Sequence, residues 1–228
     1  MSLRDFGPNE LMFLLLATRW TILLAVIAFA GGGLVGLVVA AMRVAPLPPL
    51  RWLAMGYTQF FMGTPILIQL FMAYYGSSLL GFRPDAWVAA ALTFSLNGGA
   101  FFGEIFRGSI ESVPKGQWEA ATSLGFRFLP TLRLVVLPQA FRLLLPPTVG
   151  FMVQIVKSTS VASLIGMGEL ARAATQINTV TFQPVLVFGT VSLIYFALCW
   201  PLSLWAGHLE GKLGEGQERR AVKTPVAA

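Results

Sequence analysis

Long apolar runs, separated by short polar segments, constrain this chain more than any other feature of its sequence. Five of them are long enough to cross a bilayer, and they cover about residues 20–41, 53–75, 86–106, 139–156 and 184–207. A membrane-spanning helix needs about 20 predominantly apolar residues. Only 11% of the 228 residues are charged, about half the share in a typical soluble domain. The sequence therefore predicts an all-α polytopic membrane protein with about five spans.

Basic residues are distributed unequally between the two sides that these spans define. Eleven lie in the 43–51 loop, the 107–142 segment and the C-terminal tail, and five lie on the opposite side. Cytoplasmic loops carry the excess of Lys and Arg, so we expect the N-terminus outside and the C-terminus in the cytoplasm. Residues 1–19 then form a periplasmic or interfacial segment, residues 20–207 the transmembrane domain, and residues 208–228 a cytoplasmic tail. This distribution explains the net charge of +6 without a nucleic-acid partner.

Small and helix-breaking residues inside the spans predict how the helices pack. Gly31, Gly32, Gly33 and Gly36 would let a neighbouring helix approach closely. Pro65 should kink the second span and free a backbone carbonyl, which only protein or a wet cavity can satisfy at that depth.

Two polar residues, Asn97 and Glu104, lie in the third span. Glu104 and Arg107 are three residues apart and share a helix face. We therefore favour an ion pair near the cytoplasmic surface over a direct gating role for Glu104. A further helix, at about residues 171–177, is expected to lie at the outer surface.

The sequence offers little for catalysis or metal binding. Cys199 lies inside an apolar run, and His208, the only histidine, follows the last span with no ligand partners nearby. There is no phosphate-binding Gly-rich loop and no nucleophile–His–acid set. The sequence thus predicts no catalytic residue and no metal site.

A polar, basic segment at about residues 107–138 separates the third and fourth spans. Pro114 and Gly116 break the preceding helix. Residues 117–124 then have helix-forming character, and Gly125 is a suitable C-terminal stop. A second helical piece, residues 129–136, leads to Pro138, which would open the next span near its first turn. The segment therefore predicts a short helix outside the bilayer.

The same segment carries a motif with a family resemblance. It reads Glu119-Ala120-Ala121, three residues, Gly125, nine residues, an aliphatic Val135, one residue, then Leu137-Pro138. This resembles the cytoplasmic coupling loop of ABC importer permeases of type I. The wider text, with Val113-Pro114-Lys115-Gly116-Gln117 and Leu137-Pro138-Gln139-Ala140, is similar to the branch that takes up polar amino acids. Met62, Ser158 and Val161 depart from that branch, which usually has Arg, Asp and Leu in these places.

The resemblance implies a fold, partners and a mechanism. Residues 20–207 would be an ABC transmembrane type-1 domain in the bacterial inner membrane. Its coupling helix, with Glu119, Ala120, Ala121 and Gly125, would seat in a groove of a separate ATPase. The implied partners are an ATPase dimer that binds ATP and Mg²⁺, a second permease subunit, identical or paralogous, and an outer solute-binding protein. This chain itself would bind no cofactor, and it would contact lipid.

Four consecutive polar residues, Lys157, Ser158, Thr159 and Ser160, end the fourth span. If the chain between is helical, Lys157 lies about 28 Å beyond Pro138. One interpretation is that these residues border the translocation cavity, because polar residues at that depth would otherwise meet lipid. The other is that the lysine extends to the interface and the hydroxyls cap the next helix. The sequence leaves both open.

Two other functional classes compete with an ATP-driven importer subunit. An ion-coupled secondary carrier usually has more spans, often arranged in internal repeats, and this sequence shows no internal repeat. An intramembrane enzyme would need a nucleophile or a metal set. The importer subunit is therefore the favoured interpretation.

Overall fold

The computed structural model describes residues 5–222, with the side chains of residues 5–212. Every regular element in this range is helical, as the sequence predicts. In chain order, the elements are α1 (Pro8–Val44), α2 (Pro48–Gly63), α3 (Ile66–Phe71), the π-helix η1 (Met72–Gly76), α4 (Ser77–Leu79), α5 (Ala86–Glu111), α6 (Lys115–Ser123), α7 (Phe128–Pro130), the π-helix η2 (Thr131–Val136), α8 (Leu137–Ser158), the 3₁₀-helix η3 (Thr159–Ile165), α9 (Leu170–Thr181) and α10 (Pro184–Val222).

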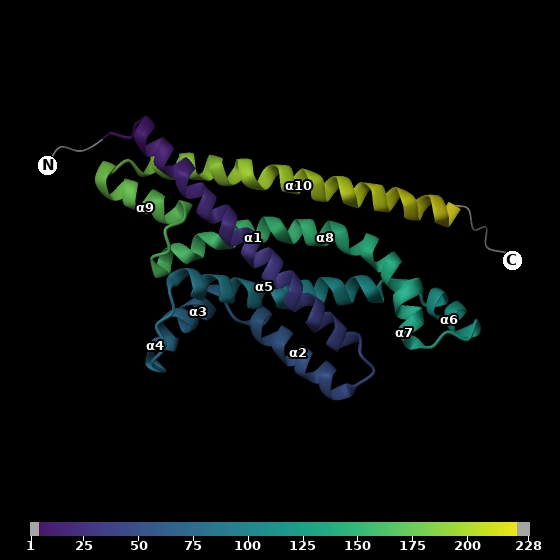
Figure 1. Cartoon of the computed structure of the whole chain (residues 1–228). Helices are drawn as coiled ribbons and strands as arrows, with labels where there is room; N and C mark the ends of the chain where they lie inside the picture. The colour runs from purple at the N-terminus through teal and green to yellow at the C-terminus, as the bar shows by residue number, and fades with distance from the viewer. Residues whose placement is uncertain (1–4, 223–228) are drawn as a thin grey trace.

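The described chain runs back and forth along one direction (Figure 1). Four helices are long and apolar enough to cross a membrane: Pro8–Val44, Ala86–Glu111, Phe128–Ile165 and Pro184–Lys212. The second predicted span, residues 53–75, is not one continuous helix, because the chain breaks between α2 and α3. After α1 the chain turns back along α2 and α3, and the first and last described residues lie at opposite ends of the molecule (Figure 1).

The outermost helices extend beyond their predicted limits. Residues 1–19 were expected to form a periplasmic or interfacial segment before the first span, and α1 is one helix of 37 residues that begins at Pro8. At the other end, α10 continues to Val222 as a helix of 39 residues, so no helix boundary falls at residue 208. Hydropathy marks only the part of a helix that lipid covers. Polar residues with good helix propensity, such as Glu210 and Lys212, continue the same helix beyond it.

Helices α1 and α5 form the tightest pair in the bundle, and glycines make the contact. A Cβ at Gly36 would lie 2.4 Å from the Phe102 Cβ, and a Cβ at Gly99 would lie 2.4 Å from the Val35 Cγ1. Both distances are too short for real atoms, so only glycine permits this approach. The predicted close packing is confirmed for Gly31, Gly32 and Gly36, whereas Gly33 has nothing near it.

A cluster of ion pairs joins α1 and α5 near the C-terminal ends of both helices. Glu104 on α5 accepts hydrogen bonds from the Arg107 guanidinium, and the Arg43 Nη2 of α1 lies 3.7 Å from the Glu104 Oε2. Arg107 also pairs with Glu111. The predicted Glu104–Arg107 pair is thus confirmed, and it joins α5 to the end of α1.

Helix α9 is the predicted outer helix, and a buried carboxylate fastens it. Glu169 caps its N-terminus by accepting a hydrogen bond from the Arg172 amide at 2.9 Å. It also accepts hydrogen bonds from Thr21 of α1 and Tyr195 of α10, at 3.3 and 3.2 Å. Burial raises the pKa of Glu169, although these hydrogen bonds oppose the shift. One residue thereby links three helices at this end of the bundle.

Candidate functional site

A break in the second pass forms one wall of the candidate site. Pro65 has no N–H, so the Phe61 carbonyl, four residues earlier, loses the helical donor it would otherwise have. The side-chain amide of Gln69 donates to the Phe61 carbonyl at 2.9 Å and to the Thr64 carbonyl at 3.0 Å. Asn97 of α5 donates to the Phe61 carbonyl as well, at 3.2 Å. The predicted kink is confirmed, and of the two expected ways to satisfy the freed carbonyl, protein or a wet cavity, the structure shows protein donors.

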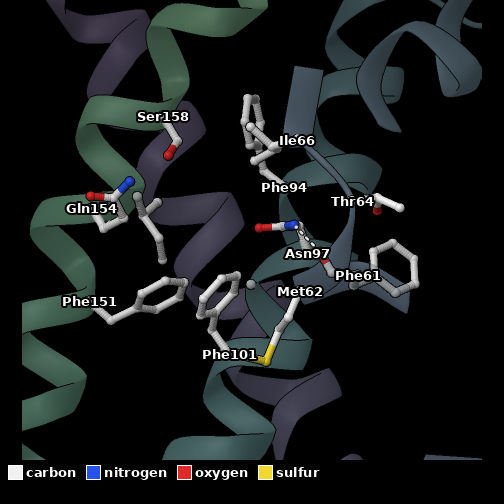
Figure 2. A pocket seen from close by; sticks show the side chains of 12 residues that line it. Phe61, Met62, Thr64, Ile66, Phe94, Asn97, Phe101, Phe151, Gln154 and Ser158 are labelled. Atoms are coloured by element: carbon white, nitrogen blue, oxygen red, sulfur yellow. Dashed lines mark hydrogen bonds between the residues drawn. The ribbon is translucent and has the colours of Figure 1, made fainter. Parts of the chain in front are cut away.

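A cavity of about 180 Å³ lies between this break, α5 and α8. The view in Figure 2 shows α8 on one side and α5 with the α2–α3 break on the other. The twelve residues that line it are Phe61, Met62, Thr64, Ile66, Phe94, Asn97, Gly98, Phe101, Phe151, Gln154, Ile155 and Ser158.

The cavity lining is mostly apolar, with a few neutral polar groups. Phe101 and Phe151 stack with ring centroids 5.0 Å apart and close one side (Figure 2). The polar members of the lining are Thr64, Asn97, Gln154 and Ser158. This mixture of apolar walls and a few convergent polar groups is typical of sites for small molecules.

The structure separates the four polar residues predicted to border a cavity. Ser158 lines it, but Lys157 is exposed on another side of α8 and is absent from the lining. Thr159 is fully buried, with its hydroxyl donating to the Val156 carbonyl at 2.7 Å. The Ser160 hydroxyl donates to the Lys157 carbonyl. Lys157, Thr159 and Ser160 do not line this cavity, because consecutive residues of a helix point in different directions. That they border the translocation pathway stays a prediction.

Sequence reasoning missed Gln154, which lines the cavity together with Ser158. The two residues are four apart on α8, and Phe151 lies three before Gln154, so all three share one helix face. That spacing was the available signal.

A second candidate site lies at the far end of the molecule, where α6 and α7 project beyond α5 (Figure 1). Helix α6 spans Lys115–Ser123, which confirms the predicted short helix. It ends at Gly125, which has φ +82°. The Phe126 amide bonds the Ala121 carbonyl at 3.0 Å, and the Gly125 amide bonds the Thr122 carbonyl at 2.9 Å. These two bonds form a Schellman motif, so the predicted stop is confirmed.

The residues of the Glu119-Ala120-Ala121 motif differ in their exposure on α6. Ala121 is only 3% exposed, and α6 packs against η2. Ala121 therefore packs α6 against its own chain, and its role in a contact with the ATPase stays a prediction. Glu119 and Ala120 are exposed. They are the members of the motif that remain available to a partner.

Large, exposed apolar side chains follow α6 in the chain. Leu124 is 78% exposed and Leu129 68% exposed, and Phe126 and Phe128 are also exposed. These four residues, hereafter the α6–α7 apolar patch, lie in a segment that is otherwise polar. Exposed apolar patches of this kind mark interaction surfaces.

Comparison with known proteins gives one consistent result. Residues 32–215 match the family described as binding-protein-dependent transport system inner membrane component. The L-cystine transport system permease protein TcyB of Bacillus subtilis is 39% identical over 195 residues, covering 85% of this chain and 83% of that protein. The arginine transport system permease protein ArtQ of the same organism is 33% identical, covering 92% of this chain and 97% of that protein.

Solved structures agree with the sequence comparison. The crystal structure of an amino acid ABC transporter with histidines superposes with a TM-score of 0.86 at 29% identity, covering 93% of this chain and all of that chain. An inward-facing structure of the MetNI methionine ABC transporter gives a TM-score of 0.76 at 19% identity, which extends the likeness of fold alone.

Proposed function

Because the chain belongs to the family of binding-protein-dependent transport system inner membrane components, we propose separate roles for its two candidate sites. The chain is the permease subunit of an ABC amino-acid importer, a multi-pass protein of the inner membrane. It is not catalytic, and ATP hydrolysis belongs to a separate subunit. In our proposal, α6 and the α6–α7 apolar patch bind that ATPase, and the cavity beside Pro65 is where the amino acid crosses. The ion-coupled carrier is thereby set aside.

The exposure of Leu124 and Leu129 carries the first part of the proposal. Burying two such side chains against a partner contributes about 1.5–3 kcal/mol each. Glu119 and Ala120 lie on the exposed surface of the adjoining helix and would meet the same partner. Gly125 would hold the helix end in place, and Ala121 would fix α6 to η2.

A continuous helical segment supports the coupling of the two sites. It runs from Phe128 to Ile165 and includes η2, against which α6 packs, as well as Gln154 and Ser158 of the cavity. ATP and Mg²⁺ would bind an ATPase dimer below α6. A second permease subunit would complete the pathway, and a solute-binding protein would deliver the amino acid from outside.

The docking role is tested by charge substitutions in the patch. Leu124→Asp and Leu129→Asp should leave the permease in the membrane at normal amount, because both side chains are exposed in this chain. The amount of ATPase that co-purifies in mild detergent should fall at least about tenfold, since each charge must be desolvated in the contact. Leu79→Asp is the matched control, because Leu79 is 90% exposed at the opposite end. Equal recovery of the ATPase with all three variants would overturn the proposal.

A further inference from the structure

The orientation of the Asn97 amide is fixed by its neighbours. Its Nδ2 lies 3.2 Å from the Phe61 carbonyl and 3.1 Å from the Gln69 Oε1. A carbonyl only accepts, so the nitrogen of the Asn97 amide must face it. The Gln69 amide is fixed in the same way, because its nitrogen donates to the Phe61 and Thr64 carbonyls. Flipping either amide would bring two acceptors together.

This orientation turns the Asn97 Oδ1 toward the cavity. Figure 2 shows the oxygen pointing away from Phe61 and toward the α8 wall. Among the side chains that the structure describes, none donates to this oxygen. The break at Pro65 therefore places a free acceptor in an otherwise apolar wall of α5.

The opposite wall carries free groups that can donate. Gln154 and Ser158 of α8 lie across the cavity from Asn97 (Figure 2). Neither has a hydrogen-bond partner among the described residues. A primary amide and a hydroxyl both donate and accept. The cavity thus has an acceptor on one side and donors on the other.

No residue of the cavity lining can ionise. An unpaired charge in such surroundings is costly, whereas neutral polar groups can pair with the opposite charges of a zwitterion. The remaining wall is made of aromatic, Met and Ile side chains, which suit an uncharged side chain of the cargo.

From this arrangement we propose that the cavity selects amino acids whose side chains carry no charge. The cargo ammonium donates to the Asn97 Oδ1, and its carboxylate accepts from Gln154 and Ser158. Gln69 is a positioning residue, because it holds the Asn97 amide in the orientation that exposes the acceptor. The inference rests on the proposed function of the cavity as the amino-acid pathway.

The experiment measures equilibrium binding of radiolabelled amino acids to the purified permease–ATPase complex in detergent. The probes are glutamine and methionine, which are neutral, arginine, which is cationic, and glutamate, which is anionic. A neutral probe should bind at least about tenfold more tightly than either charged one, a preference typical of a site with no counter-charge. Ser158→Asp should weaken the binding of every probe, because a carboxylate at this position cannot donate to the cargo carboxylate and repels it.

Variants of the cavity residues test whether the amino acid binds in this cavity, independently of which amino acid is preferred. Gln154→Leu and Ser158→Ala should each weaken binding of the neutral probe about tenfold, as loss of one donor to a charged group does. Gln69→Leu should also weaken binding of the neutral probe. Gln69→Glu should bind the neutral probe as weakly as Gln69→Leu does, because a carboxylate cannot donate to the Phe61 carbonyl. Thr179→Ala, exposed on α9, is the control.

Three results would count against the inference. If arginine or glutamate binds as tightly as the neutral probes while Gln154→Leu weakens all of them, the site stands and the cargo class is wrong. If no cavity variant changes the binding of any probe, the amino acid binds elsewhere and both proposals about the cavity fail. If the intact complex, with its ATPase bound, binds none of the four probes, both fail as well.

Discussion

Gly125 is the residue on which the geometry of α6 most directly depends. It has φ +82°, and a Cβ built there would meet nothing within 4 Å, so its requirement is conformational rather than steric. We expect Gly125→Ala to destabilise the loop by about 1 kcal/mol. Gly116 offers a matched control, because it also has open space around it but lies within α6. Gly116→Ala should be neutral or slightly stabilising. Thermal unfolding of the permease–ATPase complex would distinguish the two, and equal shifts would contradict this account of Gly125.

Single residues also show where sequence reasoning succeeds and where it stops. Gly125 was predictable because a glycine after a helical pattern is a local signal. The burial of Ala121 was not, because it depends on where η2 lies relative to α6. The free oxygen of Asn97 depends on Phe61 of α2 and Gln69 of α3. Such contacts between distant segments leave no pattern in a single sequence.

At the scale of helices, the α1–α5 pair is the rigid part of the bundle. We expect Gly36→Leu to destabilise the protein by about 1–3 kcal/mol, the usual range for overpacking, because the new side chain would run into Phe102 and Gly103. Gly33→Leu, three residues away with nothing within 4 Å, should leave stability unchanged. The midpoint of thermal unfolding in detergent is the measurement. A similar midpoint for both variants would mean that the pair can separate without cost.

The helices themselves were largely predictable and their ends were not. Apolar length marked the four long helices, and Pro65 marked the break between α2 and α3. That break became the wall of the cavity because its freed carbonyl recruits Gln69 and Asn97. The sequence did not predict that α1 begins at Pro8 or that α10 continues to Val222. A helix does not have to end where its apolar stretch ends, and a polar residue alone does not stop it.

For the molecule as a whole, five predicted spans would place its two ends on opposite sides of the membrane. The first described residues lie near α9, and the end of α10 lies toward α6 (Figure 1). With 11 basic residues assigned to one side and five to the other, we predict an outer N-terminus and a cytoplasmic C-terminus. Alkaline phosphatase, which is active only outside the cytoplasm, should be inactive when fused after residue 228 and active in the loop at residues 80–84. The opposite pattern, or activity in both fusions, would reject this orientation.

Two adjacent prolines create one flexible point in α8, the helix that connects the α6 region to the cavity. Pro146 and Pro147 lie inside α8 and leave two carbonyls without backbone donors, so bending concentrates there. The arm from Pro147 to Ser158 is about 16 Å long. A swing of about 10° at the joint would therefore carry Ser158 roughly 3 Å, about the diameter of a water molecule. If the ATPase rotates the α6 end of this segment, as the proposed function requires, Ser158 would move by about the size of one water molecule at the cavity wall.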